Sequence, residues 1–155
     1  IIGNPVKHSL TPKIHNFWFK QNNIDAIYEK KEISESKLPE VVKDIRDDKI
    51  YGINVTVPFK KKAISFVDEL TSEANESQSI NTIYKENDKV IGHNTDIAGF
   101  ELAIKYAKYE VADKKIFILG AGGVSPSIIY SLKKMKASKS SRKPLCRPPR
   151  WPLQG

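Results

Sequence analysis

The clearest alternation of apolar and polar positions lies in residues 52–60, which read GINVTVPFK. Ile53, Val55 and Val57 are apolar at every second position, a period that is typical of a β-strand. Pro58 has no N–H group to donate to a neighbouring strand, so it ends the ladder. The pattern therefore predicts a strand that runs up to this proline.

The polar residues of the same stretch share one face. Asn54 and Thr56 alternate with the apolar positions, and Lys60 follows about a turn later. Open α/β sheets bind ligands at the carboxyl ends of their strands. An amide, a hydroxyl and an ammonium group there suit a small polyhydroxylated anion. A buried strand that runs into a solvated lysine cluster, residues 60–62, explains the pattern equally well, and the stretch alone leaves both interpretations open.

Helical spacing first appears after the turn-rich loop GNPVKHSLTP. Thr11, followed by proline, matches an N-cap and a first helical residue. A helix is predicted over residues 12–22, with Ile14, Trp18 and also Phe17 as candidates for the inner face.

Two hydroxyl groups stand near the positive end of this helix, on Ser9 and Thr11. A carboxylate or a phosphate would fit there. Capping by Thr11 alone, with Ser9 unused, is the commoner arrangement and explains the same residues.

The middle of the chain alternates between short strand and helix patterns. A strand is predicted at residues 26–28, and Ser34 or Ser36 is expected to cap the helix that follows. The apolar positions of that helix are Leu38, Val41, Val42 and Ile45. Another helix is predicted over residues 61–67, and Thr71 caps a short helix with the sequence SEANES. This order predicts a parallel sheet with crossover helices.

A β-hairpin is predicted next. Residues 79–84, SINTIY, and residues 90–91 flank a polar turn, as the two arms of a hairpin do. The second arm leads into GHNTD, where Asp96 precedes a helical pattern over residues 97–106. Asp96 either only caps this helix or also faces a cleft.

A glycine-rich turn lies between a strand pattern and a helix pattern. Residues 115–119, KIFIL, are typical of a buried strand, and residues 120–125, GAGGVS, follow with Ser125 in the last small position of GxGxxG. Ile128, Ile129 and Leu132 then recur at helical spacing. The arrangement favours a dinucleotide diphosphate on a helix N-terminus over a purely structural turn.

Composition argues against several classes of function. No apolar run approaches the roughly 20 residues that cross a bilayer. The net charge is +8, but residues 139–155 hold five basic residues and no acid, which leaves +3 for residues 1–138 and does not indicate a nucleic-acid binder. Cys146 is the one cysteine, and the histidines lack metal-ligand spacing, so neither a disulfide framework nor a metal site is expected. A cytoplasmic location fits this cysteine usage.

Both ends of the sequence depart from the pattern of the body. Residues 1–2, two isoleucines, read like a strand already under way, so the N-terminus is expected to be clipped. After Ala137 the sequence has four prolines, no acid and no periodicity. It is expected to be disordered or out of frame.

Five motifs stand in one order: GNPVKHSLTP, GINVTVPFK, SINTIY, GHNTD and ILGAGGV. Together they resemble the shikimate dehydrogenase family, enzymes that reduce 3-dehydroshikimate to shikimate with NADPH. The resemblance implies an α/β fold: a substrate-binding domain with a mostly parallel sheet over residues 1–95, then the first part of a Rossmann NADP-binding domain over residues 96–138. Residues 139–155 match nothing in the family, so a C-terminally truncated member is expected.

The resemblance also assigns roles. Lys60 would be the catalytic acid/base that gives a proton to the ketone oxygen, with Asp96 as its partner, and no metal is needed. Ser9 and Thr11 would hold the substrate carboxylate. The remaining substrate contacts would come from Asn54, Thr56, Asn81 and Asp96, and the diphosphate of NADP would be wrapped by Gly120, Ala121, Gly122, Gly123 and Val124.

The departures from the family pattern leave alternatives open. Gln78 and Ser79 stand where members commonly have Gly-Ala. The arginine loop that reads the NADP 2′-phosphate and a late substrate-contacting glutamine have no counterpart, so NADP rests on the family alone. A quinate/shikimate dehydrogenase that uses NAD and a non-catalytic shikimate-binding fragment remain alternatives. A homodimer is a further expectation for the full-length protein.

Overall fold

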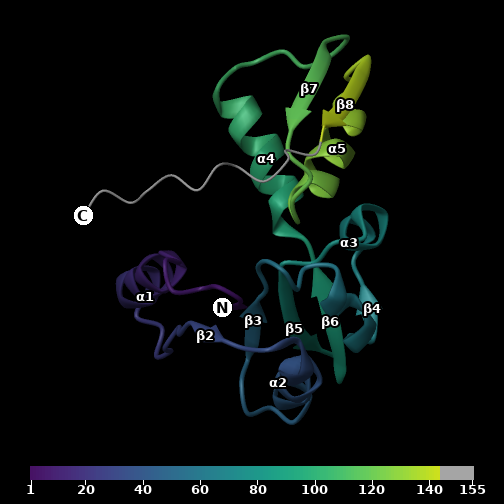
Figure 1. Cartoon of the computed structure of the whole chain (residues 1–155). Coiled ribbons are helices and arrows are strands. Elements are labelled where there is room, and N and C mark those ends of the chain that lie inside the picture. Colours follow the sequence, from purple (N-terminus) through teal and green to yellow (C-terminus); the bar gives the residue numbers. More distant parts are fainter. Residues whose placement is uncertain (144–155) are drawn as a thin grey trace, which may run out of the picture.

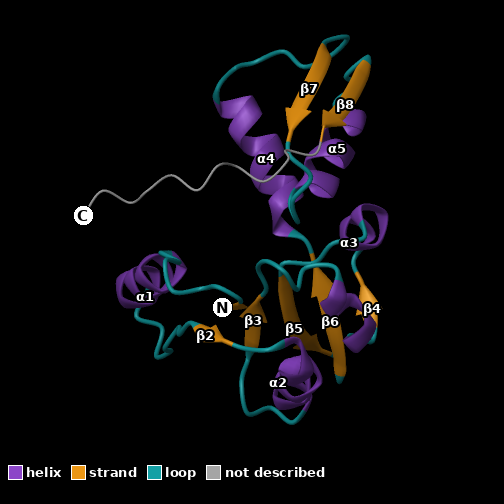
Figure 2. Ribbon diagram, in the orientation of Figure 1, coloured by secondary structure: helices purple, strands orange, loops and turns teal. Residues whose placement is uncertain are grey.

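The computed structural model describes residues 1–143, and its elements form two groups joined near α3 and α4 (Figure 1). The first group is built on a four-stranded sheet with the order β3-β5-β6-β4. These strands are β3 at Gly52–Asn54, β5 at Thr82–Glu86, β6 at Lys89–His93 and β4 at Glu69–Leu70. Helices and strands alternate through both groups (Figure 2), which confirms the α/β class.

The central sheet is mixed. β5 and β6 form the predicted antiparallel hairpin, β3 joins β5 antiparallel, and β4 joins β6 parallel. The first strand of the hairpin lies later than residues 79–84, because Ile80 N–H bonds to Lys60 O and so leaves the ladder. β3 is also shorter than predicted, and Val57 is exposed rather than part of the ladder.

A small parallel pair, β1 at Ile2–Gly3 and β2 at Lys31–Glu32, lies beside the sheet. The strand predicted at residues 26–28 is wrong. Tyr28 N–H bonds to Asn16 Oδ1 at 2.8 Å, and Asn16 Nδ2 donates to Tyr28 O at 2.9 Å. A side chain therefore takes both backbone groups that a strand partner would need.

The core lies between the sheet and α2 at Leu38–Arg46, which packs against β5 and β6. All four apolar positions predicted for this helix are buried. The predicted serine cap is wrong: a 3₁₀-helix at Glu35–Lys37 comes first, and the hydroxyls of Ser34 and Ser36 bond to each other at 2.8 Å. The core also includes Ile2, Ile33, Ile53, Val55, Phe59, Ala63, Ala74, Ile80, Ile83 and Val90.

Helix α1 at Thr11–Gln21 lies to one side of the sheet (Figure 1), and all of its residues are at least partly exposed. The predicted inner face is therefore wrong, since Ile14, Phe17 and Trp18 are 45–59% exposed. Thr11 is the first residue of the helix rather than its cap, and Leu10 holds the N-cap position.

Two short helices connect the strands. A 3₁₀-helix at Lys62–Phe66 replaces the helix predicted over residues 61–67. Helix α3 at Ser72–Ser77 begins as predicted, because Thr71 Oγ1 accepts a hydrogen bond from Ala74 N–H.

The second group comprises α4 at Thr95–Tyr106, β7 at Lys115–Leu119, α5 at Ser125–Lys134 and β8 at Lys139–Lys143. β8 pairs in parallel with β7, so the expectation of disorder is wrong for residues 139–143. An extended backbone can take strand hydrogen bonds whatever its side-chain pattern. The rest of the tail lies outside the described residues.

Strand β7 is confirmed in position but not in burial. Phe117 is 55% exposed and Leu119 is 67% exposed. In the described part of the chain, β7 pairs with β8 alone, and α4 and α5 pack against each other. An apolar face of this group is therefore open to solvent.

Candidate active site

A cavity of about 610 Å³ lies at the carboxyl end of β3. It collects most of the residues expected to touch substrate, although they come from segments far apart in the sequence. Its polar lining consists of Thr11, His15, Asn54, Thr56, Lys60, Asn81, Thr82, Thr95 and Asp96.

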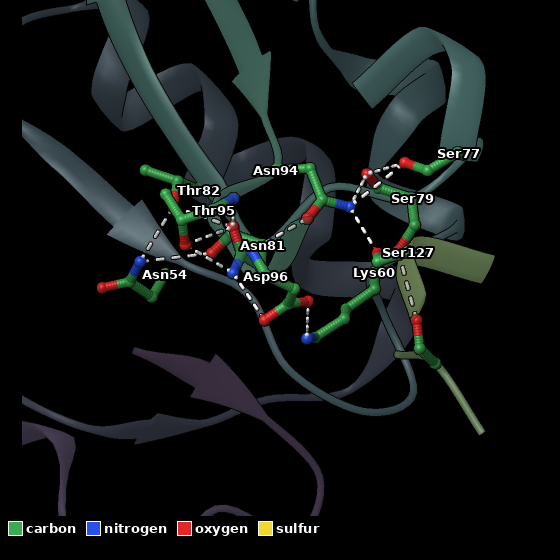
Figure 3. Close-up of polar contacts among 11 residues, drawn as sticks. Asn54, Lys60, Ser77, Ser79, Asn81, Thr82, Asn94, Thr95, Asp96 and Ser127 are labelled. Atoms are coloured by element: carbon green, nitrogen blue, oxygen red, sulfur yellow. Dashed lines mark hydrogen bonds and ion pairs between the residues drawn. The ribbon is translucent and has the colours of Figure 1, made fainter. Parts of the chain in front are cut away.

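Lys60 and Asp96 both line this cavity and form an ion pair with each other (Figure 3). Lys60 Nζ lies 2.6 Å from Asp96 Oδ2, and the two side chains are only 13% and 22% exposed. Asn81 Nδ2 donates to the other oxygen, Asp96 Oδ1, at 3.0 Å. The carboxylate is therefore held on both sides, by Lys60 and by Asn81.

Asp96 is not the cap of α4. Asn94 occupies the N-cap position, and its Oδ1 accepts the backbone N–H of Asp96 at 3.0 Å. Because the amide does the capping, the Asp96 carboxylate is free to bond Lys60. Asp96 therefore lines the cavity, and the predicted cap is provided instead by Asn94.

Asn81 is fixed by the start of the same helix. Its Oδ1 accepts Thr95 N–H at 2.9 Å, and its backbone N–H donates to His93 O at 3.0 Å. The amide orientation is thus set before any ligand arrives, and Nδ2 is directed at Asp96 and at Thr95 Oγ1.

The side chain of Asn54 is engaged on both of its atoms. Tyr28 Oη donates to Asn54 Oδ1, and Asn54 Nδ2 donates to Thr82 Oγ1 at 3.0 Å and to Asn81 O at 3.2 Å. His15 stacks on the Tyr28 ring with centroids 4.2 Å apart. Burial raises the pKa of Tyr28 to about 12, so the phenol stays protonated and donates at neutral pH.

Sequence reasoning missed Tyr28 and His15. Tyr28 lies in the segment predicted as a strand, and His15 has no metal-ligand spacing that would single it out. Neither the period nor the composition of these segments shows that an aromatic pair supports Asn54 of β3.

Ser9 and Thr11 lie together at the edge of the cavity. Ser9 Oγ donates to Thr11 Oγ1 at 3.0 Å and accepts Thr11 N–H at 3.3 Å. Both residues line an adjoining hollow of about 370 Å³, which Thr56 also lines. Ser9 is therefore in use at the start of α1, whereas capping by Thr11 was the simpler expectation.

The glycine turn is open and comes close to Lys60. Gly120 has φ +120°, a conformation that favours glycine, and a Cβ built on Gly122 would meet nothing within 4 Å. A Cβ on Gly123 would lie 3.5 Å from Lys60 Cδ. Within the described residues no side chain caps α5; Ser125 N–H donates to Gly122 O at 3.1 Å, and Pro126 has no N–H. The turn thus faces the ion pair with room for an anion.

Two kinds of site are not found in residues 1–143. No helix there is long and apolar enough to span a membrane. No group of three or more His, Cys, Asp or Glu side chains there is placed to hold a metal ion.

The family model for the shikimate dehydrogenase substrate-binding domain matches residues 1–83. The chain belongs to the shikimate dehydrogenase family. It is 53% identical over 139 residues to the shikimate dehydrogenase (NADP(+)) of Pelagibacter ubique, a match that covers 90% of this chain and 52% of that protein. The chain thus spans about half the length of the curated relatives it matches.

Solved shikimate dehydrogenases share this fold. The structure from Aquifex aeolicus aligns with a TM-score of 0.84 at 40% identity, over 91% of this chain and 53% of that one. The Listeria monocytogenes shikimate 5-dehydrogenase, solved with shikimate and NAD, aligns with a TM-score of 0.82 at 30% identity, over 91% and 49%. The family resemblance of the five motifs is therefore confirmed.

Proposed function

We propose that this chain carries the substrate-binding and proton-transfer residues of an NADPH-dependent shikimate dehydrogenase, which reduces 3-dehydroshikimate to shikimate in aromatic amino acid biosynthesis. The observation that carries the proposal is the Lys60–Asp96 ion pair, braced by Asn81 at the base of a polar cavity. Residues 1–95 would act as the substrate domain and residues 96–138 as the start of the dinucleotide domain, in a cytoplasmic protein.

Lys60 is assigned the proton transfer. Reduction of a ketone places a hydride on carbon and a proton on oxygen. The ammonium group of Lys60, a residue that lines the cavity, can supply that proton. Asp96 orients that ammonium group through a 2.6 Å contact. Proton transfer by a positioned side chain contributes about 10²–10⁴-fold to the rate.

The remaining polar groups are assigned to substrate recognition. Ser9 and Thr11 present hydroxyls beside the start of α1, where a carboxylate is favoured. Asn81, Thr56 and Asp96 line the cavity and can bond ring hydroxyls, while Asn54 shapes the wall behind them. A small anion with several hydroxyls uses all of these groups at once.

The residues of the glycine turn fit a dinucleotide diphosphate. The turn from Gly120 to Val124 leaves open space at Gly122, and it leads into the N-terminus of α5, where an anion is favoured. When bound, NADPH supplies the hydride. The name of the Pelagibacter ubique relative, shikimate dehydrogenase (NADP(+)), supports NADP over NAD.

A second candidate is a protein that binds shikimate without turnover. It is favoured by the exposed apolar face of β7, where Phe117 and Leu119 lie open to solvent, because a loose second group would hold a dinucleotide poorly. The complete set of cavity residues favours the enzyme.

The test has two arms. Calorimetric titration of the chain with shikimate should show specific binding, and absorbance should report NADP⁺ reduction when shikimate is added. Binding with turnover supports the dehydrogenase, and binding without turnover supports the second candidate. Absence of shikimate binding at millimolar concentration would overturn both.

A further inference from the structure

A side-chain hydroxyl from the first group of elements bonds the glycine turn in the second group. Ser79 Oγ donates to the carbonyl oxygen of Gly123 at 3.2 Å, across 44 residues of sequence (Figure 3). Ser79 is 2% exposed, so water does not compete for this bond.

Ile80, the residue after Ser79, bonds the backbone of Lys60, which lies close to Gly123. Ile80 N–H donates to the carbonyl of Lys60 at 2.9 Å. Gly123 and Lys60 are themselves close, since a Cβ on Gly123 would lie 3.5 Å from Lys60 Cδ. Ser79 therefore bonds the segment of Gly123, in the second group of elements, and Ile80 bonds the segment of Lys60, in the first.

The backbone of Ser79 is itself fixed. Asn94 Nδ2 donates to Ser79 O at 2.7 Å and to Ser127 Oγ of helix α5 at 2.8 Å. Asn94 and Ser127 are 1% and 0% exposed. The backbone of Ser79 is thus held by a buried polar cluster, and the bond to Gly123 is not a chance surface contact.

The bond also sets which way the turn faces. A glycine-rich turn can rotate its peptide planes freely. A carbonyl oxygen that turned toward the opening would repel a phosphate, whereas the N–H groups attract it. A Gly123 carbonyl that is bonded to the Ser79 hydroxyl is not free to turn toward a phosphate.

We propose that Ser79 is a positioning residue, which holds the glycine turn in the orientation that binds a dinucleotide diphosphate next to Lys60. The proposal rests on the proposed function for its ligand. Ser79 acts through the backbone of Gly123 and touches neither substrate nor cofactor.

The test compares Ser79→Ala with Ser131→Ala. Ser79→Ala removes one hydroxyl and adds no atom to a buried position, so the variant protein is expected to fold. Ser131 is a matched control: it is buried, and its hydroxyl donates to Ile97 O within the second group of elements. The measurements are NADPH affinity by fluorescence, shikimate affinity by calorimetry, and exchange of the Ser125 amide, which donates to Gly122 O and closes the turn.

Ser79→Ala should weaken NADPH binding and speed Ser125 amide exchange, each by about 2- to 10-fold, the worth of one hydroxyl bond. Shikimate affinity should not change, and Ser131→Ala should leave the NADPH affinity and the Ser125 exchange as they are. Equal effects of the two variants, or wild-type exchange and NADPH affinity in Ser79→Ala, would overturn the proposal. If the wild type does not bind NADPH, the cofactor in the proposed function fails and with it the positioning role, while the exchange rates still decide whether the hydroxyl tethers the turn.

Discussion

The phenol of Tyr28 donates a hydrogen bond to the amide oxygen of Asn54, from a loop to strand β3 at the edge of the four-stranded sheet. This bond leaves Asn54 Nδ2 to face Thr82 and Asn81. A residue in irregular structure therefore sets the orientation of a side chain at the base of the cavity.

Tyr28→Phe should weaken shikimate binding by about 2- to 10-fold, because the loss of one hydrogen bond frees the Asn54 amide to rotate. Calorimetric titration measures the change. Tyr51→Phe is the matched control, because Tyr51 is 98% exposed. The Tyr51→Phe protein should bind shikimate as the wild type does. Equal affinities for all three proteins would show that the phenol does not position Asn54.

Lys60→Ala should lower kcat by about 10²–10⁴-fold with the fold preserved, because it removes the proposed proton donor. Steady-state kinetics with shikimate and NADP⁺ measures this, and circular dichroism checks folding. Lys61→Ala should keep nearly full activity, because Lys61 lines a different hollow, beside α3 and α5. A rate near that of the wild type in Lys60→Ala would remove Lys60 from the mechanism.

Ser9→Ala should weaken shikimate binding by about 1.5–3 kcal/mol, the range for a hydrogen bond to a charged group. The carboxamide analogue of shikimate is the control ligand, because it lacks the charge that the hydroxyls are proposed to bind. Calorimetry should show a smaller loss for the analogue. If both ligands lose the same affinity, Ser9 does not contact the carboxylate.

Asn94→Ala should lower the free energy of unfolding by roughly 2–4 kcal/mol. It removes an N-cap, worth about 1 kcal/mol, and leaves buried partners such as Ser127 without their bond. Urea unfolding measures the change. Asn75→Ala, on the exposed side of α3, should stay within about 0.5 kcal/mol of the wild type. A similar small change in Asn94→Ala would mean that the buried cluster adds little to stability.

Hydrogen exchange should be faster in β7 than in β5 and β6. Phe117 and Leu119 of β7 are exposed, whereas Ile83 of β5 and Val90 of β6 are fully buried. Local opening is easier where little apolar surface is covered. Equal protection of the two groups of elements would show that they unfold as one unit.

The spacing of apolar residues predicted the elements that bury one face and expose the other. The four buried positions of α2 and the hairpin of β5 and β6 are examples. It failed at α1, which has an apolar stripe like that of α2 but lies beside the sheet with that stripe largely exposed. Nothing in a local pattern says whether a stripe will find a partner.

The residues that line the candidate site were predicted better than the residues that hold them in place. Lys60, Asp96 and Asn81 are found together, as the family motifs imply, because each motif carries one of them. The cap of α4 was assigned to Asp96 instead of Asn94, since both residue types cap helices and stand two positions apart. Tyr28 could not be found, because its bond to Asn54 depends on a tertiary approach across 26 residues.

Lys60 is held at both ends. Its carbonyl accepts the N–H of Ile80 at 2.9 Å, and its ammonium group lies 2.6 Å from the Asp96 carboxylate. A free lysine side chain loses about 1.5–2 kcal/mol of rotamer entropy when it is ordered. In this cavity Lys60 is already bound to Asp96, so that entropy is lost when the chain folds. The proposed proton donor would therefore have its geometry set before a substrate arrives.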